Sequence, residues 1–189
     1  MSAPISSDAV RHAIAAALEA LAAFDDAEAR DIGETLAWIR SGAEIFRLAK
    51  PDTPPKHLIA YFMVIDGDHL LLVDHKNSGL WLPPGGHVDP GEHSRDTVVR
   101  EAGEELGIEA AFLRSGPVML TVVETVGRTA GHTDVCLWYA LRGDRHSVLD
   151  YCRDEFHGIR WFHKDALPKT RVEPCLGRFV AKYFRETAV

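Results

Sequence analysis

Three glutamates near the middle of the chain have a spacing that can hold a metal ion. Glu101, Glu104 and Glu105 stand at positions i, i+3 and i+4, and on an α-helix these positions share one face. Like charges this close destabilise a helix, because each carboxylate raises the pKa of its neighbours. A hard divalent cation relieves the repulsion, and all-oxygen ligands suit Mg²⁺ or Mn²⁺. The spacing therefore indicates a metal site, although acidic runs on helices are more often solvated faces.

The residues on both sides of this helix strengthen the functional interpretation. Before it comes a loop rich in Gly and Pro, residues 85–92, whose backbone can approach a ligand closely. After it, Gly107 can end the helix as a left-handed cap. The whole pattern resembles a complete Nudix box: Gly86, five residues, Glu92, seven residues, then Arg100-Glu101-Ala102-Gly103-Glu104-Glu105-Leu106-Gly107-Ile108.

The resemblance implies an α/β fold, an α/β/α sandwich with a mixed β-sheet. It implies an enzyme that uses Mg²⁺, or alternatively Mn²⁺, to hydrolyse a phosphoanhydride bond in a nucleoside triphosphate or in a nucleoside diphosphate linked to another moiety. The roles that it implies, position by position, are metal binding by Glu101, Glu104 and Glu105, orientation of a box carboxylate by Arg100, support of this network by Glu92, and a backbone contact from Gly86.

A base must accept the proton of the water that attacks phosphorus. Glu105 is one candidate. In some Nudix relatives a carboxylate from a later loop serves instead, and here Asp154 or Glu155 could reach the site from just before a short predicted strand at 159–162.

The sequence defines substrate contacts less sharply. Gly85 and Gly86 precede His87 at the start of the box, which looks like a bacterial Nudix branch; His87 could donate to a phosphate or merely close the turn. Asp134 lies in a predicted strand with apolar neighbours, so a role in the site and a hydrogen-bonded structural role both remain open. Aromatic side chains in strands are more often core than base-stacking residues, and this prediction covers Trp81, Trp138, Tyr139 and Trp161.

Residues that mark Nudix subfamilies argue against two substrate classes, ADP-ribose and dinucleoside polyphosphates. Relatives acting on ADP-ribose carry a Pro, and relatives acting on dinucleoside polyphosphates carry a Tyr, some fifteen to eighteen residues after the last Gly of the box. Here that region reads Val122-Val123-Glu124-Thr125, so neither marker is present.

Two other functions compete with hydrolysis. A Nudix-fold sensor or interaction module would bind a nucleotide without turnover, but such modules tend to lose box carboxylates, and none is missing here. An isomerase resembling isopentenyl diphosphate isomerase would need a Cys in its site; Cys136 is the only Cys within a predicted strand, and no local pattern supports that chemistry.

The remaining elements are predicted from periodicity and turn residues. Apolar runs at 57–65 and 69–73 flank the turn Asp66-Gly67-Asp68 and predict a hairpin. The box helix is expected at 94–106, strands near 118–126, 132–141 and 159–162, and a closing helix at 174–185 with Pro174 in its first turn.

An N-terminal extension is expected to form a helical hairpin. Apolar residues repeat at helical spacing from Ser7, at Val10, Ile14, Leu18, Leu21 and Phe24, and again at Ile32, Leu36, Ile39 and Ala43; between the two runs, Asp25 and Glu28 resemble a capping box. The predicted organisation is an extension at 1–49, a Pro-rich connector at 50–55 and a Nudix domain at 56–189. Neither stripe can be buried by the hairpin alone, so it must cover the domain or contribute to a homodimer.

Composition excludes several classes of function. The net charge of −7 argues against sequence-independent binding to a nucleic acid polymer, which needs a basic surface. No long uncharged apolar run could span a membrane, and no basic leader precedes the Ala-rich first helix. Three widely spaced cysteines without a CxxC pair predict reduced thiols. We therefore expect a cytoplasmic protein with a small-molecule nucleotide substrate.

Overall fold

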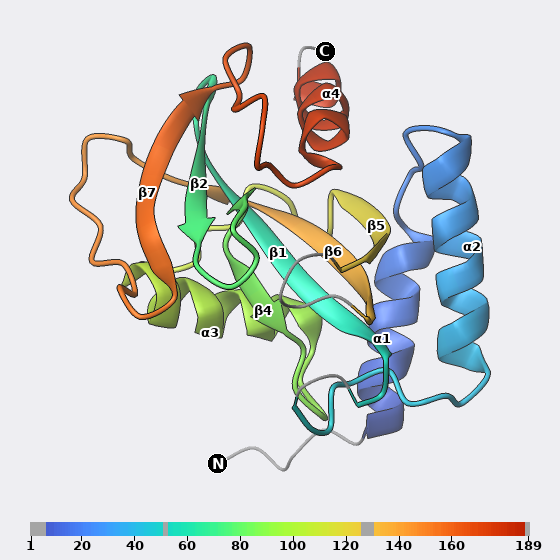
Figure 1. The fold of residues 1–189 in the computed structure, drawn as a ribbon. Coiled ribbons are helices and arrows are strands. Elements are labelled where there is room, and N and C mark those ends of the chain that lie inside the picture. Colours follow the sequence, from blue (N-terminus) through green and yellow to red (C-terminus); the bar gives the residue numbers. More distant parts are fainter. Residues whose placement is uncertain (1–6, 51–52, 126–130, 188–189) are drawn as a thin grey trace.

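The fold is built around one mixed sheet. The computed structural model describes residues 7–50, 53–125 and 131–187. Strands follow the order β3-β2-β1-β6-β5, with β4 paired to β1 and β7 paired to β2 (Figure 1). Among the pairings of the described strands, that of β1 with β6 alone is parallel, and the others are antiparallel. The elements are α1 (Ser7–Glu19), α2 (Asp26–Arg40), β1 (Lys56–Asp66), β2 (His69–His75), β3 (Trp81–Leu82), β4 (Gly85–His87), α3 (Ser94–Leu106), β5 (Met119–Glu124), β6 (Thr133–Arg142), β7 (Phe156–His163) and α4 (Leu176–Thr187).

Strand β1 divides the molecule into two hydrophobic layers. Its side chains alternate between the two faces of the sheet, as the period of two requires. Leu58 and Phe62 pack with apolar residues of α1, α2 and α3, whereas Ile59 and Met63 pack on the other face with residues of α4. The predicted α/β/α sandwich with an N-terminal helical hairpin is confirmed.

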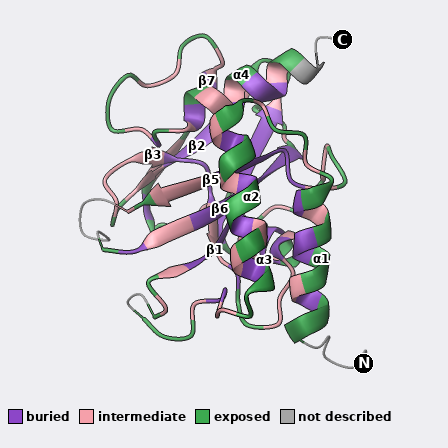
Figure 2. Ribbon diagram, turned by 90° about the vertical axis from the view of Figure 1, so that its right-hand side faces the viewer, coloured by how far each residue is buried: buried purple, intermediate pink, exposed green. Residues whose placement is uncertain are grey.

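The N-terminal hairpin is part of this core. Val10 and Ile14 of α1 and Ile39 of α2 are buried in the same apolar cluster as Leu58 and Val98. Figure 2 shows α1 and α2 carrying exposed residues on one side and buried residues on the other. The apolar stripes that motivated a dimer are therefore covered within the chain, and a homodimer stays a prediction.

A buried ion pair fastens the hairpin to the far end of the chain. Lys182 Nζ of α4 donates to Glu28 Oε1 of α2 at 2.8 Å, and both side chains are almost fully buried. Glu28 Oε1 also accepts the backbone N–H of Leu120 in β5, and its Oε2 accepts that of Phe24. The capping box proposed for Asp25 and Glu28 is thus formed in a modified way. The Asp25 side chain accepts the backbone N–H of Glu28. The Glu28 side chain, however, accepts the backbone N–H of Phe24 instead of that of Asp25.

Several predicted boundaries were wrong. Helix α1 ends at Glu19, so Leu21 and Phe24 lie beyond it, and Ala43 lies beyond α2, which ends at Arg40. Residues 85–87, read as loop, form the short strand β4. Helix α4 begins at Leu176, so Pro174 precedes it. Connector residues 51–52 and Val126 of the strand predicted at 118–126 lie outside the described residues.

No helix within the described ranges is long and apolar enough to cross a bilayer.

Candidate active site

Helix α3 carries the predicted carboxylates to the edge of β4. The helix spans Ser94–Leu106, and Gly107 ends it in the left-handed conformation with φ of 64°, which glycine adopts without steric cost. Glu105 is 3% exposed, and its Oε2 accepts the backbone N–H of Gly85 at 2.8 Å. The Glu101 side chain is 14% exposed and that of Glu104 is 63% exposed. The three carboxylates therefore range from buried to open within one turn.

Gly86 allows this close approach of helix and strand. A Cβ atom at position 86 would lie 1.9 Å from Glu101 Oε1, far inside van der Waals contact. Any side chain there would displace the carboxylate or the strand. The first glycine of the box is thus required by the position of Glu101.

Arg100 ties the loop of the box to its helix. Its Nε and Nη2 donate to the two oxygens of Glu92, both at 3.1 Å. Its Nη1 donates to Glu101 Oε1 at 2.7 Å and to Glu104 Oε2 at 3.2 Å, and its Nη2 also reaches the carbonyl of His87 at 3.2 Å. Such charge-assisted, forked contacts fix geometry as well as charge. This is the arrangement expected of Arg100 and Glu92, whose functional roles remain predictions.

Burial strongly affects protonation in this group. Desolvation, and then the negative charge of Glu101, raise the pKa of Glu105 to about 9. Desolvation also raises the pKa of Glu101, although the adjacent Arg100 opposes the shift. At Glu92 burial acts in the same upward direction, but hydrogen bonds from Arg100 and Thr97 outweigh it and the pKa is lowered. Glu105 therefore holds a proton at neutral pH unless a cation joins it.

The carboxylates open into a cavity of about 680 Å³, a volume in the range of sites for nucleotide-sized ligands. Gly85, Gly86, His87 and Asp134 line it, as do the three box glutamates. Glu155 is also on its wall, whereas Asp154 is not among the described lining residues. Apart from Asp154 and Glu92, the second of which is hydrogen-bonded to Arg100, the residues predicted for the site thus border one cavity.

Two cationic residues on the cavity wall were not predicted. Arg47 and Lys50 follow α2 and line the cavity together with the box carboxylates. Together with Arg100 they add positive charge to a cavity lined by several acidic residues. No sequence signal marked them, because only packing brings the N-terminal extension to the box.

Glu173 is a further residue that the sequence did not reveal. It lines the cavity, is 4% exposed and lies three residues before α4. Burial raises its pKa to about 7, although backbone N–H groups of Cys175 and Leu176 oppose the shift. A proton on this carboxyl is therefore exchanged near neutral pH.

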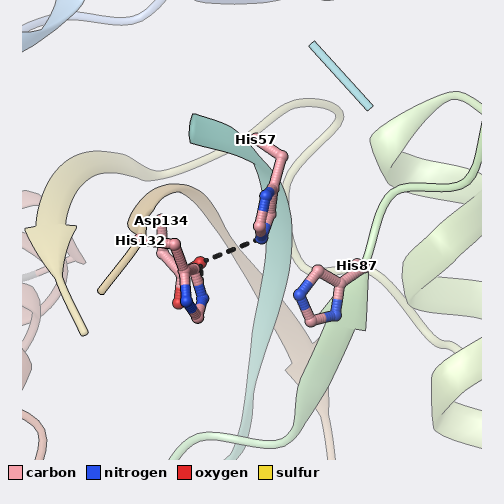
Figure 3. Close-up of side chains that lie close together, drawn as sticks. All are labelled: His57, His87, His132 and Asp134. Carbon is pink, nitrogen blue, oxygen red and sulfur yellow. Dashed lines mark ion pairs between the residues drawn. The ribbon is translucent and has the colours of Figure 1, made fainter. Parts of the chain in front are cut away.

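A second polar cluster lies at the same cavity. Figure 3 shows His57 of β1, His87 of β4, and His132 and Asp134 at the start of β6 converging on one point. The register explains this: His57 is paired with Asp134 across the parallel strands, and His87 is paired with Ile59. Burial, and then the positive charge of Arg47, lower the pKa of His87 to about 2, so its ring is neutral.

The four aromatic residues assigned to the core do not border this cavity in the described part of the chain. Trp138 and Tyr139 are fully buried, and Trp81 packs edge-on against Phe162. Their assignment to packing agrees with the structure.

Comparison with known proteins agrees with the box. A model of the NUDIX domain matches residues 55–183. The chain is 41% identical over 112 residues to the asymmetrical bis(5'-nucleosyl)-tetraphosphatase of Mus musculus, covering 56% of this chain and 71% of the mouse protein. It is 45% identical over 54 residues to a putative 8-oxo-dGTP diphosphatase of Bacillus subtilis strain 168, covering 28% of this chain and 36% of that protein.

Solved structures share the fold. A MutT Nudix hydrolase from Burkholderia pseudomallei superposes with a TM-score of 0.52 at 22% identity, over 67% of this chain and 96% of that one. A MutT/nudix family protein from Enterococcus faecalis superposes with a TM-score of 0.54 at 17% identity, over 92% of this chain and 73% of that one. Since the family model covers more than half of the sequence and the box residues meet at one cavity, the chain belongs to the Nudix hydrolase family.

Proposed function

We propose that this chain hydrolyses a phosphoanhydride bond in a nucleoside triphosphate, or in a nucleoside diphosphate linked to another moiety, with Mg²⁺ as the metal and Mn²⁺ as an alternative. The observation that carries the proposal is the convergence of Glu101, Glu104 and Glu105 on a cavity that also presents Arg47 and Lys50. Acidic ligands and cationic side chains in one cavity suit a phosphate-bearing substrate that arrives with a divalent metal.

The carboxylates fit a divalent cation on physical grounds. Glu105 is buried beside Glu101, and its pKa is raised to about 9, so both carboxylates can be ionised at neutral pH only when a cation compensates their charge. Glu101, Glu104 and Glu105 would hold it, with a backbone contact from Gly86 and with Glu92 supporting the group through Arg100. When bound, such an ion neutralises charge on the diphosphate and lowers the pKa of a water molecule.

The protein's own residues then divide the remaining tasks. Arg47 and Lys50 attract the phosphates into the cavity, which is also lined by Gly85 and Gly86. His87 and Asp134 are candidates for contacts to substrate, His87 only as a neutral donor. Glu155 is the proposed base that accepts the proton of the attacking water, with Glu105 as the alternative.

The substrate class is open within the family. The mouse relative is named for cleavage of a bis(5'-nucleosyl) tetraphosphate and the Bacillus relative for 8-oxo-dGTP. The Tyr expected for dinucleoside polyphosphate hydrolysis is absent from positions 122–125. The experiment therefore tests dinucleoside polyphosphates and nucleoside triphosphates alike.

The experiment measures phosphate-product release by the full chain with Mg²⁺ and then with EDTA. The substrates are nucleoside triphosphates, nucleotide sugars, ADP-ribose and dinucleoside polyphosphates. We expect turnover of one class that EDTA abolishes. Replacing Glu104→Gln and Glu105→Gln together should lower kcat by about 100-fold or more, since several kcal/mol of charge stabilisation depend on these ligands.

Glu109→Gln is the matched control, because Glu109 is exposed just beyond α3, and it should leave kcat unchanged. Activity retained by the double variant would overturn the assigned roles. Nucleotide binding without turnover across the whole panel would favour the sensor or interaction module instead.

A homodimer, a cytoplasmic location and the lack of a nucleic acid polymer as partner remain predictions from the sequence. Sedimentation velocity of the full chain tests the dimer. A monomer at micromolar concentration would contradict it.

A further inference from the structure

The cluster of His57, His87, His132 and Asp134 has the dimensions of a metal site. One ligand atom from each residue lies within 4.8 Å of the other three. Asp134 Oδ1 is 3.4 Å from His57 Nε2 and 3.1 Å from His132 Nε2. Ligands about 2.0–2.1 Å from a tetrahedral Zn²⁺ lie roughly 3.3–3.4 Å from one another. The two measured separations are therefore close to those of ligands sharing one ion.

The cluster also contains buried polar atoms that lack a hydrogen bond. Within the described ranges, His57 Nε2, His87 Nε2 and Asp134 Oδ1 are buried without a hydrogen-bond partner, and His57 is 0% exposed. An unpaired buried polar group costs free energy. Three such atoms pointing to one place indicate a missing ligand.

The outer contacts set the rings in the form that binds metal. His57 Nδ1 lies 2.8 Å from the carbonyl of Pro54, so it carries the proton and donates it. In the neutral ring Nε2 then presents its lone pair to Asp134. His132 Nδ1 contacts Thr125 Oγ1 at 3.1 Å, while that hydroxyl lies 3.1 Å from the His132 carbonyl and can donate to it. Metal-binding histidines commonly hold their second ring nitrogen in this way.

We propose that His57, His87, His132 and Asp134 bind one divalent transition-metal ion of the Zn²⁺ type, at a site distinct from the carboxylates of α3. Imidazole nitrogens with one carboxylate favour such an ion over Mg²⁺, which prefers oxygen ligands. The Asp134 carboxylate disfavours a phosphate as the occupant, because the two anions would repel one another.

Four protein ligands make the site structural in character, since catalytic zinc sites keep an open position. The ion would join β1, β4 and the start of β6 at the point where the box begins. His87 follows Gly86 directly, so the ion would fix the strand that contacts Glu101 and Glu105. This inference does not depend on the proposed hydrolysis, and in it metal binding takes the place of the substrate contacts suggested for His87 and Asp134.

The experiment measures metal retained by the full chain. The chain is incubated with Zn²⁺ in the presence of excess Mg²⁺, desalted and assayed for zinc. We expect a single Zn²⁺ per chain and a higher melting temperature than in the metal-free protein. Co²⁺ in place of Zn²⁺ should give the intense visible absorption of a tetrahedral complex instead of the weak absorption of an octahedral one.

Variants assign the ligands. Asp134→Asn and His132→Gln should each weaken Zn²⁺ affinity by about 100-fold or more and remove the rise in melting temperature. His69→Gln is the control, because His69 forms a close ring pair with His163 elsewhere on the molecule, and it should change neither. Glu101→Gln in the α3 site should also leave Zn²⁺ retention unchanged.

Loss of Zn²⁺ in Glu101→Gln but not in Asp134→Asn would overturn the proposal, as would failure of the unaltered chain to retain Zn²⁺. Circular dichroism of each metal-free variant separates loss of binding from loss of the fold.

Discussion

Gly86 shows how one residue without a side chain determines the geometry of several others. Its Cα faces Glu101 so closely that a methyl group would meet the carboxylate. Arg100 holds Glu101 from the other direction. The position of this ligand therefore depends as much on the missing side chain as on the arginine.

Replacing Gly86→Ala should lower kcat by about 100-fold, because displacements of about 1 Å in a site have effects of this size. Gly103→Ala is the matched control: nothing lies within 4 Å of a Cβ at position 103, and alanine favours the helix by up to about 1 kcal/mol. We expect this control to keep its kcat with equal or greater stability. Steady-state kinetics with Mg²⁺ measure kcat, and circular dichroism measures stability. Full activity in Gly86→Ala would contradict the prediction, because it would show that β4 or Glu101 can shift without loss of function.

Glu155 is the proposed base because it lines the cavity, whereas Asp154 beside it does not line the described wall. Glu155→Gln should reduce kcat by about 10²- to 10⁴-fold with little change in KM, as expected when a general base is lost. Asp154→Asn should remain within a few-fold of the unaltered chain. The reverse pattern would transfer the role to Asp154, and normal kcat in both variants would leave Glu105 as the candidate.

At the scale of elements, α2, β5 and α4 meet at the ion pair of Glu28 and Lys182. Both side chains are almost fully buried, so neither charge can be hydrated if the other is removed. The pair therefore matters more through the penalty of breaking it than through its net attraction.

Lys182→Met should lower the free energy of unfolding by about 3–5 kcal/mol, because it leaves the Glu28 charge buried without a partner. Adding Glu28→Gln to this variant should recover part of the loss. Glu19→Gln is the control, since the pair of Arg40 with Glu19 is more than half exposed and such pairs contribute less than about 1 kcal/mol. Urea titrations measure all four proteins, and an equal, small loss in Lys182→Met and Glu19→Gln would refute the buried-charge argument.

How much of the fold could be predicted depended on how local the signal was. Helix α3 was predicted with its observed bounds, because its apolar periodicity and its Gly107 cap lie within the segment itself. Strand β4 was missed, since Gly-Gly-His has neither strand propensity nor an apolar pattern and exists by pairing with β1. The carboxylates of the site were found for the same reason as α3. His57 was not, because its partner Asp134 becomes its neighbour only through the parallel register of β1 and β6.

At the scale of the whole molecule, the extension and the catalytic fold share one interior. Apolar residues of α1 and α2 lie in the cluster that also holds residues of α3 and the sheet, and Arg47 and Lys50 bring charge from this extension to the cavity. Stability and activity are therefore properties of the chain from α1 to α4 together.

Buried Glu173 makes that stability depend on pH. Its pKa is raised from 4.5 to about 7 in the folded chain, so the folded state binds the proton more tightly than the unfolded state. The contribution of this proton to the stability of the fold is greatest below the pKa of the unfolded state, 4.5, and is lost as the pH rises through about 7. When the pH rises from about 5 to about 8, the free energy of unfolding of the unaltered chain should fall by roughly 2–3 kcal/mol more than that of Glu173→Gln.

Urea unfolding of both proteins at the two pH values measures this difference. Glu109→Gln serves as the exposed control and should follow the unaltered chain. Identical pH dependence in Glu173→Gln and the unaltered chain would mean that Glu173 is ionised to the same extent in the folded and unfolded states.

The pairing of Glu28 with Lys182 has a consequence for the time course of biosynthesis. The two residues are 154 positions apart, and ribosomes add about 5–20 residues per second. Glu28 is therefore synthesised roughly 8–30 s before its partner. During that interval docking of α2 would bury an uncompensated charge, so the hairpin should wait until α4 has been translated, and the cavity wall that carries Arg47 and Lys50 should be completed last.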